Sequence, residues 1–135
     1  MCYNSLVYKS INRNLKEAVA VMEHTMNLYP SPFFKIKNGV KTIELRLYDE
    51  KRRKVVPGDT IRFYNSENAN ETILTKVLEL YVFDTFDELY KELPLLECGY
   101  TENDICSASA KDMDEYYSPE RQKQFGVIGI RIAVI

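Results

Sequence analysis

A glycine followed by a short, charged strand constrains the fold of this chain more than any other feature. The stretch runs from Gly39 to Arg46 and carries Lys41, Glu44 and Arg46 at spacings of three and two residues. Side chains alternate along a strand, so Glu44 and Arg46 share one face while Ile43 lies on the other. The pattern predicts a strand that buries one face and presents charge on the other, with Lys41 at the rim of the preceding turn.

Length and composition predict one globular domain, because the chain has 135 residues, of which 45% are hydrophobic and 28% are charged. No apolar run approaches the roughly 20 residues that a membrane-spanning helix needs. The N-terminal residues also lack the apolar segment of a signal peptide. We therefore expect a soluble, cytoplasmic protein that does not enter a membrane.

The cysteines and the histidine give no sign of a metal centre or a disulfide framework. Cys2, Cys98 and Cys106 are odd in number and lack C-x-x-C spacing. His24 is the only histidine, and a lone histidine is more often a packed or surface residue than a ligand. We expect no cofactor and no metal site, although a magnesium ion bound by carboxylates remains an open alternative.

Positive charge is concentrated in one segment of an otherwise acidic chain. The formal net charge is -2, but residues 35–62 carry nine Lys and Arg against four Asp and Glu, which is a local charge of +5. Such a segment favours a local anionic ligand over general coating of a long nucleic acid. For residues 51–54 alone, a solvated surface loop is an equally good interpretation.

Turn and capping signals divide the chain into short strands with helices between them. The expected strands cover residues 25–28, 42–47, 60–64, 72–82 and 127–135. The expected helices cover residues 14–22, 32–37 with Ser31 as cap, 86–93 with Asp84 or Thr85 as cap, 111–117, and 119–124 with Ser118 as cap. Met22 is an alternative translation start, which would make residues 1–21 an N-terminal extension before a domain over 22–135. This order predicts an α+β fold, a small mixed β-barrel closed by its C-terminal strand.

The stretch from Gly39 to Arg46 resembles the G-x-K-x-x-E-x-R signature of ASCH domains, a branch of the PUA-like superfamily. The resemblance covers about residues 22–135 and extends to residues 32–33, 49–52, 58–63, 116–118 and 126–130. A G-D-x-I-x-F pattern at 58–63 makes it more specific than the signature alone. The resemblance implies a PUA-like β-barrel with a cleft beside the signature loop. It also implies RNA or a modified nucleotide or nucleoside as the ligand.

The resemblance gives the signature residues roles at that cleft. Lys41 and Arg46 would contact phosphate or a base carbonyl, the arginine as a two-pronged donor. Glu44 would accept from an exocyclic amino group, or would position either cation through an ion pair. The other expected ligand-binding residues are Gly39, Thr42, Tyr48, Lys51 and Arg52. Arg53 and Lys54 would add salt-sensitive contacts, and Tyr64 and Phe63 are further aromatic candidates, although Phe63 also fits a core position.

A small hydrolase is the alternative function on the same residues. One bacterial branch of the family hydrolyses the amide of acetylated cytidine with the signature lysine, a threonine three residues later and a distal glutamate. Here Lys41 would be the catalytic base or nucleophile, with a pKa lowered by burial or nearby cations, beside Glu44. However, Glu44 stands where that branch has threonine. Glu79 and Glu88 are the candidates for the distal glutamate, and ribonuclease activity is the other enzymatic alternative.

Overall fold

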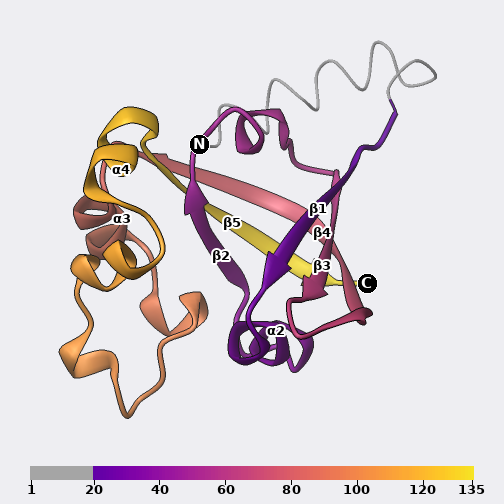
Figure 1. Cartoon of the computed structure of the whole chain (residues 1–135), viewed down its shortest axis with the longest axis horizontal. Coiled ribbons are helices and arrows are strands. Elements are labelled where there is room, and N and C mark those ends of the chain that lie inside the picture. Colours follow the sequence, from indigo (N-terminus) through magenta and orange to yellow (C-terminus); the bar gives the residue numbers. More distant parts are fainter. Residues whose placement is uncertain (1–19) are drawn as a thin grey trace.

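A computed structural model describes residues 20–135, which form a curled five-stranded sheet with helices between its strands (Figure 1). The strands lie in the order β1-β3-β4-β5-β2. Their bounds are β1 (Glu23–Leu28), β2 (Ile43–Leu47), β3 (Thr60–Asn65), β4 (Asn68–Phe83) and β5 (Val127–Val134). β1 and β3 are parallel, and the other neighbours are antiparallel. The curled sheet is a half-barrel, which confirms the predicted α+β barrel architecture.

The C-terminal strand lies inside the sheet. β5 pairs with β4 on one side and with β2 on the other. Among the described residues, β1 and β2 are therefore the two ends of the sheet. Side-chain contacts described below bridge these two ends.

Within residues 20–135, three α-helices and four short 3₁₀ helices connect the strands. They are α2 (Pro30–Lys37), η1 (Arg52–Lys54), α3 (Phe86–Glu92), η2 (Leu95–Cys98), η3 (Ile105–Ser107), η4 (Ala110–Glu115) and α4 (Pro119–Phe125). α3 and α4 lie together on one side of the sheet (Figure 1). The expected caps form at two of these helices, because the Thr85 and Ser118 side chains accept hydrogen bonds from the backbone of the first turn.

The start of α2 differs from the prediction. The helix begins at Pro30 with Tyr29 at its N-cap, so the expectation that Ser31 caps a helix starting at Pro32 was wrong. Pro30 already has the fixed φ and the missing N–H that suit a first helical position. The helix is two residues longer at its N-terminal end as a result.

The observed bounds of other elements also differ from the predicted ones. β4 begins at Asn68, because its ladder with β3 continues to Asn65, so the polar turn is shorter than expected. The helix expected over 111–117 is the 3₁₀ helix η4, which a capping box between Ser109 and Asp112 starts earlier. The helix expected over 14–22 and the extension over 1–21 fall largely outside the described residues.

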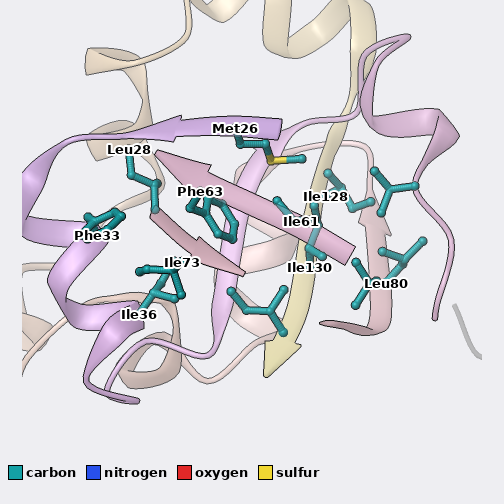
Figure 2. Close-up of a cluster of buried hydrophobic side chains, with 13 residues drawn as sticks. Met26, Leu28, Phe33, Ile36, Ile61, Phe63, Ile73, Leu80, Ile128 and Ile130 are labelled. Atoms are coloured by element: carbon teal, nitrogen blue, oxygen red, sulfur yellow. The ribbon is translucent and has the colours of Figure 1, made fainter. Parts of the chain in front are cut away.

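The main hydrophobic core lies inside the half-barrel. Inward-facing residues of β1, β3, β4 and β5 meet Phe33 and Ile36 of α2 (Figure 2). Phe63 is fully buried in this cluster, which identifies it as a core residue and not as a group free to stack on a base. α2 is therefore fixed to the sheet by its apolar face, and its last turn leads directly to the signature stretch.

β2 separates this core from a second one. The aliphatic residues of β2 pack with α3 in the second cluster. The opposite face of β2 holds Glu44 and Arg46, which pair with Ile130 and Ile128 of β5. Directly paired residues share a face of the sheet, and both isoleucines belong to the main core. The charged face of β2 therefore points into the half-barrel.

Candidate functional site

A tight turn after α2 delivers the signature residues to β2. Gly39 has a φ of +78°, a conformation that glycine adopts without the steric cost of a Cβ. The N–H groups of Val40 and Lys41 both donate to the carbonyl of Lys35, at 2.9 and 3.0 Å. These bonds reverse the chain and fix the backbone of Lys41 one turn beyond the helix.

Lys41, Glu44 and Arg46 form one ion-paired group, here called the signature cluster. The Nζ of Lys41 lies 2.8 Å from Oε1 of Glu44, and the Nε of Arg46 lies 2.6 Å from Oε2. The three side chains are only 10%, 3% and 13% exposed, in that order. The charged face of β2 is therefore largely covered and not an open surface, because it is turned into the half-barrel.

The two cations hold Glu44 in its charged form. Burial alone would raise its pKa, but the charges of Lys41 and Arg46 and the hydrogen bonds from both lower the pKa of Glu44 to about 2. The cluster thus contains two positive charges and one negative charge in a largely buried place. Its net positive charge favours an anionic group at its open side.

Two cationic side chains bridge the ends of the half-barrel at what we call the β1–β2 seam. Arg46 Nη2 donates to the carbonyl of Asn27 at 2.7 Å, and Lys51 Nζ donates to the carbonyl of Thr25 at 2.6 Å. These carbonyls belong to alternate residues of β1, on the edge that does not pair with β3. The seam therefore joins two strands through side chains, without a backbone ladder.

Positive charge accumulates at this seam. The pKa of Lys51 is lowered by partial burial and by the charges of Arg52 and Arg46, against a smaller opposing effect of Asp49. Mutual repulsion of this kind indicates more cations than anions in the immediate surroundings. The seam is thus the place where the basic segment of the sequence meets the signature cluster.

The segment around η2 covers Lys41 from the other side. The N–H and hydroxyl of Thr42 donate to Glu97, at 2.9 and 3.0 Å. Arg131 Nη1 donates to the same Glu97 carboxylate at 2.8 Å. A Cβ on Gly99 would lie 3.3 Å from the side chain of Lys41, so the backbone passes close over the lysine. Sequence reasoning missed Glu97 and Gly99, because residues 95–110 have no period and no recognisable motif.

The remaining predicted ligand-binding residues occupy varied positions. Arg52 is half-buried and paired with Asp49 at 3.1 Å, so its charge is partly neutralised. The guanidinium of Arg53 covers the ring of Tyr48, with its central carbon 4.2 Å from the ring centroid. Tyr64 lies on β3. Of the predicted residues outside the signature, Lys51 is the one with a hydrogen bond at the seam described above.

The two candidates for a distal glutamate have other environments. Glu79 accepts a hydrogen bond from the Tyr81 hydroxyl at 2.6 Å, on β4. Glu88 is exposed on the first turn of α3. The carboxylate that pairs with Lys41 is that of Glu44, at 2.8 Å.

Two surface clefts lie away from the signature cluster. One, of about 850 Å³, is formed by the start of α3, the end of α4 and neighbouring residues that include Tyr48 and Arg53. The other, of about 460 Å³, is lined by Asn27, Tyr64 and residues of the β3–β4 turn. Lys41, Glu44 and Arg46 line neither of them. The signature cluster is therefore a candidate site because of its charges and its exposed rim, and not because it lines a deep cavity.

His24 is a packed residue. Its Nε2 lies 2.8 Å from Oδ2 of Asp59, and both side chains are buried. Asp59 also accepts from the N–H groups of Met22 and Val56, at 3.2 and 3.1 Å. The pair ties β1 to the turn before β3. Within residues 20–135, no group of three or more His, Cys, Asp or Glu is arranged to hold a metal ion.

The family assignment follows from this fold together with sequence comparison. The family model that describes ASCH domain sequences matches residues 26–135, which is most of the chain. This chain belongs to the ASCH domain family. Its half-barrel is accordingly a PUA-like fold, as the signature predicted, and the matched range includes every signature residue.

Solved structures agree with this assignment. The crystal structure of the hypothetical protein PH0355 is 33% identical, covers 84% of this chain and all of its own, and has a TM-score of 0.70. The solution structure of PF0455 from Pyrococcus furiosus is 30% identical over 84% of this chain and 98% of its own, with a TM-score of 0.65. The crystal structure of an ASCH domain from Lactobacillus crispatus is 10% identical, covers 93% of this chain and 87% of its own, and has a TM-score of 0.58. At this low identity the likeness supports the fold alone. Comparison with curated proteins gave no match.

In the part of the chain that the structure describes, no helix has the length and apolar character needed to cross a bilayer.

Proposed function

We propose that this ASCH domain binds a nucleotide, most effectively within single-stranded RNA, at the β1–β2 seam. The observation that carries the proposal is the pairing of Lys41 and Arg46 with one buried carboxylate, with Lys51 beside Arg46 at the same edge of the sheet. The ASCH resemblance independently points to RNA or a modified nucleotide as ligand. Phosphate is the natural partner for such a net positive cluster.

The arrangement supports different roles for the cations. Lys51 is the more exposed cation, and its present partner is a backbone carbonyl of an edge strand. A phosphate oxygen is a stronger acceptor for an ammonium group than a neutral carbonyl. We therefore assign the first phosphate contact to Lys51, with Arg46 as the second donor through its outer guanidinium nitrogen.

Glu44 is better suited to position cations than to read a base. Both of its oxygens already accept from cations, and its side chain is 3% exposed. Of the two roles that the sequence left open, the ion-pairing role fits this geometry. Thr42 acts by the bonds of its N–H and hydroxyl to Glu97, and Gly39 acts through the turn that it permits.

The same geometry argues against Lys41 as a catalytic base or nucleophile. Such a role needs a nitrogen that is free to reach the substrate. The Lys41 nitrogen is instead held in a largely buried ion pair with the Glu44 carboxylate at 2.8 Å. The hydrolase alternative has a direct test, since incubation with acetylated cytidine should release cytidine in a Lys41-dependent manner if the chain is an amidohydrolase. We expect no turnover even at high protein concentration.

Titration with short single-stranded RNAs and free nucleosides, at two salt concentrations, tests the binding proposal. The variants are Lys41→Ala and Lys51→Ala, and Lys76→Ala on an exposed position of β4 is the matched control. We expect Lys51→Ala to weaken RNA binding and to reduce the slope of log affinity against log salt by about one, because one phosphate contact is lost. Lys76→Ala should bind like the wild type. Equally weak binding by all four proteins would refute the proposal.

A further inference from the structure

Two exposed tyrosines from distant parts of the sequence lie together at the surface. Tyr29 is the N-cap residue of α2, and Tyr116 directly follows η4. Their ring centroids are 6.4 Å apart, and the ring planes are tilted by 40°. The residues are 63% and 53% exposed, so this contact leaves a large part of both rings open to solvent.

The pair stands beside the signature cluster. Tyr29 is two residues beyond Asn27, whose carbonyl accepts the hydrogen bond from Arg46. Tyr116 is close enough to Glu44 for the carboxylate to add to the increase in its pKa, after larger effects of burial, Glu115, Tyr29 and Asp112. The pair therefore lies at the rim of the site proposed above.

The backbone on both sides of the pair is fixed. Tyr117 stacks on Phe86, with ring centroids 6.4 Å apart and planes within 16°. The N–H groups of Tyr116 and Tyr117 both donate to the carbonyl of buried Met113. Tyr29 is held through its own carbonyl, which accepts from Phe33 at the start of α2. The two rings are thus exposed aromatic groups on a supported backbone, which limits the entropy lost when a ligand stacks on them.

We propose that Tyr29 and Tyr116 form a stacking platform for an unpaired base of the nucleic acid whose phosphate lies at the β1–β2 seam. This inference rests on the proposed function and narrows the ligand class to strands with unstacked bases. A base inside a duplex keeps both faces covered by its neighbours and cannot use the platform. Stacking tolerates every base because each has a π-face, so we expect little sequence preference at this position.

A strand without bases separates this inference from phosphate binding. The probes are a labelled short single-stranded RNA and the same backbone with abasic residues throughout, titrated by fluorescence anisotropy. The variants are Tyr29→Ala and Tyr116→Ala, with Tyr29→Phe and Tyr116→Phe as ring-retaining controls. Phe34→Ala removes another exposed aromatic ring, on α2 and outside the platform. Because both platform residues are exposed, their substitution should leave the fold intact. Circular dichroism verifies that each variant folds.

We expect each alanine variant to bind the base-containing RNA at least about fivefold more weakly than the wild type, the effect typical of losing one base–aromatic stack. The phenylalanine variants and Phe34→Ala should bind like the wild type, and the abasic strand should bind all of the proteins equally. Unchanged affinity of the alanine variants for the base-containing RNA would overturn the platform while leaving phosphate binding at the seam intact. A wild type that binds neither strand would overturn both proposals.

Discussion

At the scale of single residues, Glu44 has the largest consequence for the molecule. Its pKa is about 2 in the folded protein against an ordinary value of 4.5. A carboxylate with a lowered folded pKa contributes stability that is complete above its unfolded pKa and is lost as the pH falls toward the folded one. The difference corresponds to about 3 kcal/mol of unfolding free energy, present at neutral pH and lost between about pH 4.5 and pH 2.

The variant Glu44→Gln tests this contribution because it keeps the shape of the side chain and removes its charge. We expect its unfolding free energy at pH 7 to be lower than that of the wild type by about 3 kcal/mol. The gap should narrow as the pH falls from 4.5 toward 2, where the wild-type carboxyl becomes neutral too. Urea unfolding followed by circular dichroism at a series of pH values measures it. A gap that stays constant over this range would contradict the assignment of the pKa to Glu44.

The sequence predicted which residues would meet at the site but not how deeply they would be buried. Period-two alternation places Glu44 and Arg46 on one face, and a spacing of three brings Lys41 near. Whether that face is covered depends on β1 and on the segment around Gly99, which come from elsewhere in the chain. The positions of Glu97, Tyr29 and Tyr116 likewise depend on long-range packing, which no local pattern contains.

At the scale of elements, the turn between α2 and β2 requires glycine for its backbone conformation and not for space. A Cβ on Gly39 would meet no heavy atom within 4 Å, yet its φ is +78°. Gly39→Ala should therefore lower the unfolding free energy by about 1–2 kcal/mol through backbone strain alone. Gly39→Asn should cost less, because asparagine tolerates this conformation better. Equal stability of Gly39→Ala and the wild type in urea would show that the turn adopts another conformation.

A second prediction at this scale concerns the stability of the seam. Its two bridging side chains differ in burial, so their removal should cost different amounts of unfolding free energy. Arg46→Ala removes a partner from buried Glu44 and should lower the unfolding free energy by about 3 kcal/mol or more. Lys51 is exposed and donates to a carbonyl that water can also reach, so Lys51→Ala should cost less than about 1 kcal/mol. Chemical unfolding of both variants gives the comparison. A cost for Lys51→Ala as large as that for Arg46→Ala would mean that the seam, and not the buried carboxylate, determines the stability.

Element boundaries followed local chemistry where that chemistry was strong. Thr85 and Ser118 cap their helices as expected, and the strand that follows the Gly58 turn was predicted. The predictions failed where two signals competed, as with the alternating serine and proline at the start of α2. The order of the strands could not be read from the sequence, because it depends on which strands pair across the barrel.

At the scale of the whole molecule, positive and negative charges are unevenly distributed along the chain. The net charge is -2, although residues 35–62 alone carry +5. The seam and the signature cluster lie within or against this basic segment, while the acidic remainder of the chain repels a long polyanion. We therefore predict that the protein binds one short stretch of single-stranded RNA. The salt dependence of its affinity should correspond to few phosphate contacts.

The most direct test of the central claim locates the ligand on the protein. The full chain, labelled with ¹⁵N, is titrated with a short single-stranded RNA, and the backbone amides and the Arg46 side-chain Nε–H are followed by two-dimensional NMR. We predict that the largest shifts occur along β1 from Thr25 to Tyr29, at Arg46 Nε–H and at Lys51. Shifts confined to the larger cleft between α3 and α4, with the Arg46 signal unchanged, would contradict a ligand site at the β1–β2 seam.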